Sequence, residues 1–330
     1  VHDAAELADA LGAARREADH AFGDARIFLE KFIERARHIE IQVLADEHGN
    51  VVHLFERECS AQRRHQKIVE ESPSPALDAE TRAQMGAAAV SAARAVGYRN
   101  AGTVEFIVAR DGAFYFLEMN TRLQVEHPVT ELVTGLDLVK LQFAIAAGKS
   151  LPFTQADLSQ RGHAIECRLY AEDPRNQFLP TGGLLLTLLP PEGPGIRVDS
   201  GVRSGDAISL HYDPLIAKII VYDRTRADAI QRMRAALDAT VILGTTTNLD
   251  FLRALLAHPA FSAGEVDTGF IEAHGDSLLG NVPPVDAQTR DLAVIAAALA
   301  DLHSAPQAAA ERIDYDPWTR ADGFRGGAPR

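Results

Sequence analysis

In the first part of the chain, apolar residues recur at helical spacing and then, farther on, at every second position. Residues 3–22 carry apolar side chains near helical spacing, with Asp3 as a candidate N-cap and a break at Gly23. Farther on, Ile39, Ile41 and Val43 alternate with polar residues, as expected for half-buried strands. The pattern therefore predicts one helix followed by antiparallel strands at Ile27–Ile33, 39–43 and 51–56, with a turn at His48, Gly49 and Asn50.

A second helix and a hairpin are expected in the middle of the chain. Thr81–Val96 has helical spacing and stops at Gly97, a typical C-terminal cap. Gly102–Asn120 contains two alternating apolar runs on either side of Asp111 and Gly112. Asp-Gly is favoured in two-residue type I′ turns, so this segment predicts a β-hairpin.

The rest of the chain mixes short strands with helices, which predicts an α+β unit. A helix at Leu138–Ala147 ends at Gly148, and the polar segment 154–162 indicates a domain boundary. The strands expected after it are His163–Tyr170, Leu184–Leu189, Ile208–His211 and Ile216–Tyr222, and the helices are Arg226–Leu237, Asn248–Leu256 and Gln288–His303.

Composition limits the classes of function. The 330 residues are 46% hydrophobic, which is enough for two domain-sized cores. A formal charge of −13 argues against nucleic-acid binding, which needs a basic surface. The apolar runs are too short for a membrane helix. The two cysteines, Cys59 and Cys167, fit neither a disulfide framework nor a zinc motif, which favours a reducing compartment.

Two glutamates of the hairpin are candidates for a metal site. If Asp111 and Gly112 are the two turn residues, Glu105 lies directly opposite Glu118 with Cβ atoms roughly 5 Å apart. Alternation puts Asn120 on the same face, beside the apolar Ile107, Phe114 and Phe116. Oxygen ligands without His or Cys favour Mg²⁺ or Mn²⁺. From spacing alone, a hairpin with two solvated glutamates explains the pattern equally well.

The run after the hairpin, EMNTRLQVEHPVTE at 118–131, is densely charged. The planar guanidinium of Arg122 suits a small planar anion. Gln124 and a backbone amide could complete such a pocket, and bicarbonate would fit it.

At this point the sequence resembles biotin carboxylase, the ATP-grasp component of the biotin-dependent carboxylases. The matching segments are EMNTRLQVEHPVTE, ECSAQRRHQKIVEESP, RHIEIQVLAD, GTVEFI and RGHAIECRLYAEDP, and the resemblance covers about residues 1–275. The tail sequence YDPWTRADGFR is similar to the linking region of α subunits of the methylcrotonyl-CoA carboxylase type.

The resemblance implies roles for individual residues. Glu105, Glu118 and Asn120 would hold the Mg²⁺ or Mn²⁺ that bridges ATP phosphates. Arg122, Gln124 and the Val125 backbone would bind bicarbonate, and Glu126 would take its proton before attack on the γ-phosphate. Arg168 would steady the enolate-like biotin; a salt bridge with neighbouring Glu166 is the structural alternative.

The resemblance also assigns nucleotide contacts. Glu30, Lys31, Phe32 and Ile33 match the hinge that binds adenine, and Ile107 could pack against the base, although plain core packing would also explain these residues. Gln62, His65 and Lys67 are assigned to the nucleotide, and His38 to its vicinity. The set expected around ATP is Glu30, Lys31, Phe32, Ile33, His38, Gln62, His65, Lys67, Ile107, Glu105 and Glu118.

The expected organisation is an α+β ATP-grasp fold followed by the biotin carboxylase C-terminal α+β domain. The partial lid would occupy residues 1–32, the catalytic lobe 33–160 and the C-terminal domain 161–275. Residues 276–330 would link to a biotin-carrier module. The family's Gly-rich lid loop would precede Val1, and we expect that residues 1–330 alone carboxylate biotin negligibly.

The expected partners follow from what the sequence does not contain. It has no Met-Lys-Met biotinylation motif, so biotin would be a substrate on a separate carrier, and a carboxyltransferase subunit would complete an oligomer. The expected location is the cytoplasm, or the mitochondrial matrix in a eukaryote. The acceptor could also be acetyl-CoA, another acyl-CoA or pyruvate. Two alternatives remain, a different ATP-grasp ligase and a catalytically silent assembly module.

Overall fold

The computed structural model describes residues 1, 3–64, 66–280 and 286–303. The chain divides into two units, Val1–Gly280 and Asn281–Arg330. In the second unit, helix α9 (Ala287–His303) agrees with the predicted helix. The tail segment Tyr315–Trp318, expected to begin a linking region, lies outside the described residues. Among the described residues, no helix is both long and apolar enough to cross a membrane.

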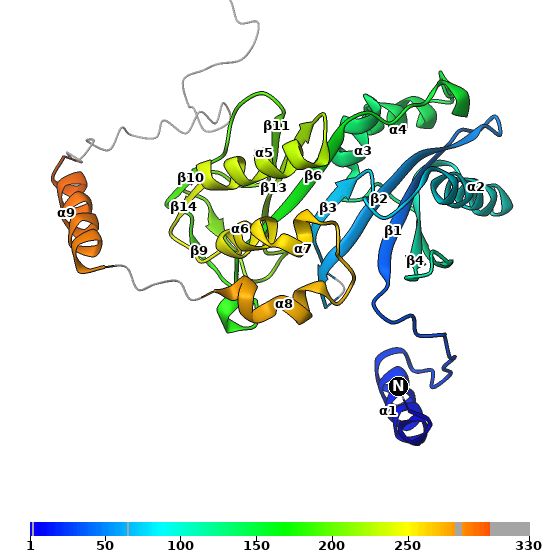
Figure 1. Ribbon diagram of the computed structural model, residues 1–330, viewed down its shortest axis with the longest axis horizontal. Helices are drawn as coiled ribbons and strands as arrows, with labels where there is room; N and C mark the ends of the chain where they lie inside the picture. The colour runs from blue at the N-terminus through cyan, green and yellow to red at the C-terminus, as the bar shows by residue number, and fades with distance from the viewer. Residues whose placement is uncertain (2, 65, 281–285, 304–330) are drawn as a thin grey trace, which may run out of the picture. The chain divides into compact units, whose positions relative to one another are not determined.

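One eight-stranded sheet organises the first unit, in the order β11-β13-β6-β3-β2-β1-β4-β5 (Figure 1). The neighbouring strands pair antiparallel throughout. Strands from both sides of the expected boundary near residue 160 therefore hydrogen-bond in the same sheet. The strands are β1 (Arg37–Ala45), β2 (Val51–Arg63), β3 (Gln66–Ser72), β4 (Asn100–Val108), β5 (Phe114–Asn120), β6 (His163–Tyr170), β11 (Ile196–Ser200) and β13 (Leu215–Asp223).

Helix α2 (Ala79–Ala95) covers one face of β1, β2 and β4. Its N-cap is Asp78, whose side chain accepts a hydrogen bond from the Thr81 amide, and Gly97 follows its end at φ +60°, a left-handed conformation that costs glycine little. The apolar positions of the strands pack against Met85, Ala89 and Ala93 of this helix. The polar positions of the same strands consequently face the other side of the sheet.

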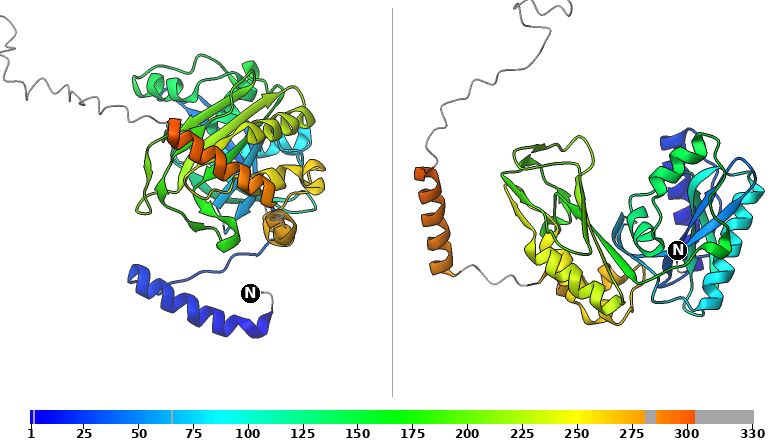
Figure 2. Two further views of the ribbon diagram at one scale, coloured as in Figure 1. Left: turned by 90° about the vertical axis from the view of Figure 1, so that its left-hand side faces the viewer. Right: turned by 90° about the horizontal axis from the view of Figure 1, so that it is seen from above.

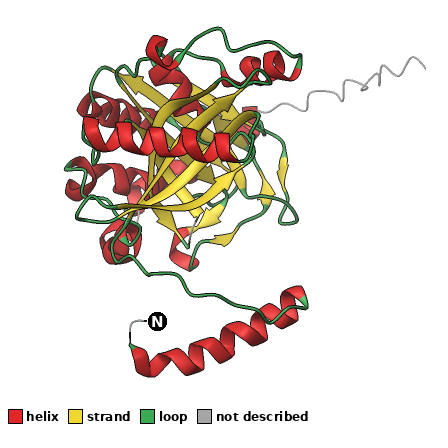
Figure 3. Ribbon diagram, turned by 90° about the vertical axis from the view of Figure 1, so that its right-hand side faces the viewer, coloured by secondary structure: helices red, strands yellow, loops and turns green. Residues whose placement is uncertain are grey.

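The larger core lies around β6 and β13. It includes helices α5 (Arg226–Ala239), α6 (Leu249–Ala257), α7 (Pro259–Ser262) and α8 (Phe270–Leu279); Figures 2 and 3 show these helices beside the strands. Helices α3 (His127–Thr134) and α4 (Leu138–Ala146) follow the hairpin. The remaining elements are β7 (Glu172–Asp173), β8 (Leu179–Pro180), β9 (Gly183–Leu184), β10 (Thr187–Leu189), β12 (Ala207–Ile208), β14 (Val241–Leu243) and the 3₁₀ turns at Ala4–Glu6, Gln155–Asp157 and Pro174–Asn176.

The strand predicted at Ile27–Ile33 is wrong. Helix α1 (Leu7–Phe22) ends at Gly23 as expected, but residues 24–33 form no strand. Both edges of β1 are already paired, one with β2 and the other with β4, so a preceding strand has no edge of β1 to join. The strand predicted at Leu184–Leu189 is split between β9 and β10. Of the strand predicted at Ile208–His211, only Ile208 is in a strand, as the second residue of β12.

The β4–β5 hairpin pairs Glu105 with Glu118 as predicted, although its turn differs. Ala109 donates to Ala113 and Gly112 donates to Ala109, so the loop contains three residues instead of two. Val108 then faces Phe114, one position out of the expected register, and a bulge at Leu117 restores it before Glu118. The bulge also moves Phe114 and Phe116 away from the glutamate face, because both rings contact Phe106 on the α2 side.

Candidate active site

A row of charged side chains crosses four neighbouring strands on the face opposite α2. Glu40 of β1 pairs with Arg57 of β2 on one side and with Glu105 of β4 on the other, and Glu105 pairs with Glu118 of β5. Directly opposite residues of antiparallel strands share a face. Glu105 and Glu118 of this row line a cleft of about 1000 Å³, whereas Glu40 and Arg57 are fully buried beside them.

Glu105 is the centre of the acidic part of this row. Its Oε1 accepts hydrogen bonds from Lys67 Nζ at 3.1 Å, Asn120 Nδ2 at 3.1 Å and Gln124 Nε2 at 2.7 Å. Its Oε2 lies 2.7 Å from His38 Nε2. Burial disfavours the charged form, but the hydrogen bond from His38 and the charge of Lys67 outweigh it and hold the pKa of Glu105 at about 2. Glu105 is therefore an anion to which several donors converge.

Asn120 joins the two paired glutamates, because its amide also donates to Glu118 Oε1 at 2.8 Å. Two carboxylates and one amide thus meet at the surface of the cleft. An amide group can present its oxygen instead of its nitrogen after a 180° rotation. The three side chains fit a divalent cation that prefers oxygen ligands and keeps positions for water and phosphate.

Lys67 connects Glu105 to two further carboxylates. Its ammonium donates to Glu40 Oε2 at 2.5 Å and to Glu126 Oε1 at 2.6 Å. Burial lowers the pKa of Lys67, yet the facing carboxylates, above all Glu40, raise it above its ordinary value. Burial opposes the charge on Glu40 as well, but Arg57 and Lys67 hold its pKa at about 2. Lys67, Glu40 and Glu105 are consequently ionised at neutral pH.

Glu126 stands between two cations. Its Oε1 accepts from Lys67 and its Oε2 accepts from Arg168 Nη2 at 2.9 Å, and only 2% of its surface is exposed. Arg168 also donates from Nε to Glu70 Oε1 at 2.5 Å. The alternative role for Arg168, a salt bridge with Glu166, is not observed: Arg168 pairs with Glu70 and Glu126, and Glu166 has no hydrogen-bond partner among the described residues.

The segment between the hairpin and α3 is held from both sides. Gln124 Oε1 accepts from Arg57 Nη2 at 2.8 Å, while the carbonyl of Val125 accepts from Lys218 Nζ at 2.6 Å. Arg122 is exposed and lines the cleft, where its Nη1 donates to the Leu123 carbonyl at 3.4 Å. A guanidinium has five N–H donors, so most of them remain for an anion.

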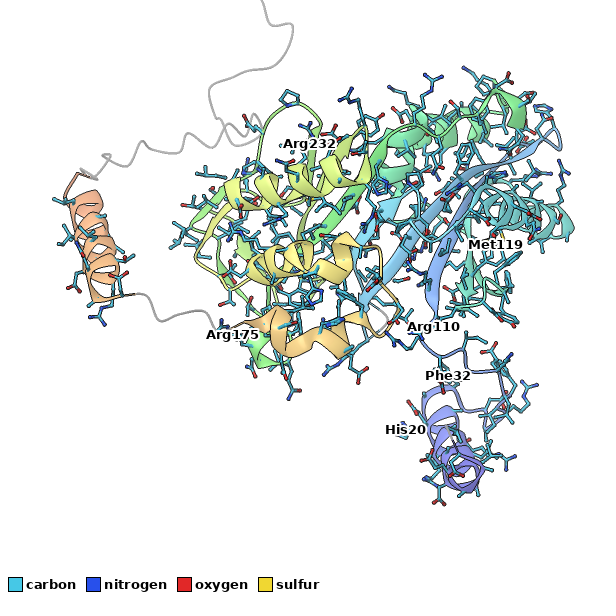
Figure 4. All side chains as sticks on the ribbon, viewed as in Figure 1. His20, Phe32, Arg110, Met119, Arg175 and Arg232 are labelled. Carbon is cyan, nitrogen blue, oxygen red and sulfur yellow. The ribbon has the colours of Figure 1, made fainter. Side chains whose placement is uncertain are left out.

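The segment expected to bind adenine also lines the cleft. Glu30, Lys31, Phe32 and Ile33 line the cleft together with Ile107, and Lys31 Nζ lies 5.5 Å from the ring centre of Tyr115. Figure 4 shows Phe32 on the segment between α1 and β1. His38 and Gln62 line the cleft too, whereas His65 lies outside the described residues. All other side chains expected from the sequence to bind nucleotide, metal, bicarbonate or biotin meet here.

Sequence reasoning missed the buried groups that position this site. Arg57 is fully buried and bonds to side chains of five residues, Glu40, Gln42, Thr103, Gln124 and Thr130. The buried Lys218 and Glu70 were missed as well, and so was the exposed Tyr115, which lines the cleft. The sequence signal for these groups was the alternation of polar and apolar residues around Glu40 and Gln42. It indicated a polar face of the strand, which continues to Arg57 on the neighbouring strand.

Comparisons with known proteins agree with this geometry. Residues 1–154 match the family model of the carbamoyl-phosphate synthase L chain ATP-binding domain, and residues 166–273 match that of the biotin carboxylase C-terminal domain. The first domain is an ATP-grasp fold, and the second distinguishes the carboxylases from other ATP-grasp ligases. The chain belongs to the biotin carboxylase family.

Relatives cover most of this chain. The α subunit of mitochondrial methylcrotonoyl-CoA carboxylase from Dictyostelium discoideum is 49% identical over 321 residues, which are 97% of this chain and 46% of that protein. Biotin carboxylase from a Nostoc species is 54% identical over 260 residues, 79% of this chain and 58% of that protein.

A solved structure with the same fold is the biotin carboxylase domain dimer of Hydrogenobacter thermophilus 2-oxoglutarate carboxylase with MgADP, ADP and bicarbonate. It is 45% identical, with a TM-score of 0.81, and the match covers 84% of this chain and 61% of that one. The chain thus spans less than two thirds of the relatives it matches.

Proposed function

We propose that this chain takes part in the ATP- and bicarbonate-dependent carboxylation of biotin through carboxyphosphate. The observation that carries the proposal is Glu126, a buried carboxylate held between Lys67 and Arg168 beside the paired glutamates of the hairpin. A base for bicarbonate, a cation for the developing charge and a set of metal ligands then share one cleft.

Glu105, Glu118 and Asn120 would hold Mg²⁺, with Mn²⁺ as a substitute, and the ion would neutralise charge on the ATP phosphates. Lys67 would bind the ATP phosphates, because its ammonium can exchange its three carboxylate contacts for phosphate oxygens. Glu30 to Ile33 and Ile107 would enclose the adenine. His65 would lie near the ribose, and Gln62 and His38 near the nucleotide. The Hydrogenobacter domain holds MgADP and bicarbonate, which supports these ligands for this chain.

Arg122, Gln124 and the Val125 backbone would bind bicarbonate next to Glu126. Proton removal by Glu126 makes the bicarbonate oxygen a better nucleophile toward the γ-phosphorus. Arg168 would then steady the enolate-like biotin while its ureido nitrogen is carboxylated. Since Arg168 already contacts Glu126, proton transfer and carboxyl transfer would occur on adjacent groups.

The biotin would arrive on a carrier domain, and a carboxyltransferase subunit would pass the carboxyl group to an acyl-CoA. Similarity to methylcrotonoyl-CoA carboxylase α subunits favours methylcrotonyl-CoA as acceptor, with pyruvate and propionyl-CoA carboxylases as related systems. An oligomer fits these relatives. Cys59 and Cys167 are both buried and unpaired, which fits a reducing compartment such as the cytoplasm. Residues 33–160 would form the catalytic lobe and 161–275 the C-terminal domain.

Nucleotide binding tests the proposal. We expect the 330-residue chain to bind MgADP with submillimolar affinity in isothermal titration calorimetry, and Glu105→Gln to weaken this binding about 10- to 100-fold by removing a metal ligand. Glu80→Gln, on the exposed side of α2, is the matched control and should bind as the parent does. Absence of MgADP binding by the parent chain would instead support a catalytically silent assembly module.

A further inference from the structure

Two glutamates of β3 and β6 form a buried pair outside the ligand sites proposed above. Glu70 and Glu166 are directly opposite each other in the antiparallel β3–β6 ladder, and both are fully buried. Opposite residues of such strands have Cβ atoms roughly 5 Å apart. Two carboxyl groups therefore lie side by side in the interior, shielded from water, in the middle of the sheet.

Three of the four oxygens of this pair have no hydrogen-bond partner among the described residues: Glu70 Oε2 and both oxygens of Glu166. The fourth, Glu70 Oε1, accepts from Arg168 Nε. Buried carboxylate oxygens without partners are costly and require an explanation. A proton on one carboxyl group would supply a donor to the other.

The surrounding charges do not ionise both groups. The nearest cation to Glu166 is Lys218 of β13, whose Nζ lies 4.0 Å from Glu166 Oε2 and donates instead to the Val125 carbonyl. Burial and the neighbouring Glu70 raise the pKa of Glu166 well above its ordinary value. Burial also raises the pKa of Glu70, to about 7, against the opposing charge of Arg168. The charged and titratable groups near the pair are Lys67 of β3, Arg168 and Tyr170 of β6, Lys218 of β13 and Glu126 before α3, and the buried thiols of Cys59 and Cys167 are also close.

We propose that Glu70 and Glu166 share one proton, and that the resulting singly charged pair fixes the guanidinium of Arg168 so that it faces Glu126. Glu70 and Glu166 are then positioning residues for the reaction. The functional part of this inference rests on the proposed role of Arg168 in biotin carboxylation. The shared proton itself depends only on the β3–β6 geometry.

Sharing one proton lets the Glu70–Glu166 pair carry a single negative charge, which balances the positive charge of Arg168. If both glutamates were ionised, the pair would carry two negative charges against the single cation that bonds to it, and like charges at such a distance raise each other's proton affinity. With one shared proton, Glu70 Oε1 stays anionic toward Arg168 while Glu70 Oε2 gains a donor. Arg168 is thereby held on one side by Glu70 and on the other by Glu126.

Infrared spectroscopy of the 330-residue chain tests the shared proton directly, because a protonated carboxyl group has a C=O stretch distinct from that of a carboxylate. We expect the parent chain to keep this band above the pH at which exposed Asp and Glu ionise. Glu166→Gln should lose it, since Glu70 then ionises beside Arg168. The double variant should lose no more than Glu166→Gln.

Thermal unfolding against pH gives a second measurement. A carboxyl group whose pKa rises on folding stabilises the protein while it is protonated, and this contribution is lost as pH rises from the unfolded value of 4.5 toward the folded one. The melting temperature of the parent minus that of Glu166→Gln should therefore fall as pH rises above 4.5 and through the raised folded-state pKa of Glu166.

The inference is overturned if the parent shows no such band, or if Glu166→Gln retains it. The parent titration alone decides the first point, so a variant that fails to fold does not leave the question open. MgADP binding is measured on the same samples. A chain that binds MgADP but lacks the band contradicts only the shared proton, and one that has the band but binds no MgADP contradicts only the proposed function.

Discussion

Replacing Arg57 by methionine should lower the free energy of unfolding by about 3–5 kcal/mol, the usual cost of removing one partner of a buried ion pair. Arg57 is fully buried, and its Nε donates to Glu40. Without the guanidinium, Glu40 would keep Lys67 as its cation, while Gln124 Oε1 would lose the donor at 2.8 Å that fixes its side chain. Chemical denaturation followed by circular dichroism measures the change.

The control for Arg57 is Arg99, an exposed arginine that approaches Glu47 at 3.4 Å. Arg99→Met should change the unfolding free energy by less than about 1 kcal/mol, because exposed ion pairs contribute little. Similar losses in both variants would mean that Arg57 is no more important than a surface charge. A second readout is MgADP binding by whatever fraction of Arg57→Met folds, which should weaken because Gln124 positions Glu105.

The register of the hairpin explains why part of the site was accessible from sequence. Asp111 and Gly112 identified a turn between two alternating runs, and that alone paired Glu105 with Glu118. The predicted pairing is correct although the predicted turn length is wrong, because the bulge at Leu117 offsets the additional residue in the loop. The positions of Phe114 and Phe116 lie between the turn and the bulge, so they were predicted on the wrong face.

Other parts of the site depend on contacts between residues distant in sequence. Arg57 meets Gln124 across 67 positions, and Arg168 meets Glu70 across 98. Local periodicity carries no information about such pairs. Local periodicity also predicted that the polar positions of β1 are exposed, because an alternating strand usually has one face toward solvent. Glu40 and Gln42 are instead buried. Only the sheet order, with β3 beside both β2 and β6, brings these groups together.

The strand predicted at Ile27–Ile33 failed for a related reason. A run of apolar residues is compatible with a strand, but a strand also needs a free edge, and β2 and β4 occupy both edges of β1. Phe28, Leu29 and Phe32 are consequently exposed. Three of the residues that line the cleft from this segment, Lys31, Phe32 and Ile33, are available to a ligand because they take no part in the sheet.

Glu126→Gln should reduce biotin- and bicarbonate-dependent ADP release by the natural gene product by about 10²- to 10⁴-fold, the usual contribution of a general base. The substitution preserves the size of the side chain and one oxygen, but it removes the negative charge between Lys67 and Arg168 and the ability to accept a proton. MgADP affinity should change much less than turnover, because the proposed metal ligands are left intact. Steady-state assays at saturating bicarbonate and calorimetry separate the two effects.

Glu131→Gln is the matched control for Glu126→Gln. Glu131 lies on α3, five positions farther on, where its Oε1 accepts from the Leu138 amide and its Oε2 from Arg197. Its loss of charge should leave ADP release within about twofold, because Glu131 does not line the cleft. If Glu126→Gln retained parental turnover, Glu126 would be reduced to an ion-pair partner of Lys67 and Arg168. Bicarbonate would then have to lose its proton to another group of the cleft, and Glu105, which lies against Lys67, would be the next residue to replace.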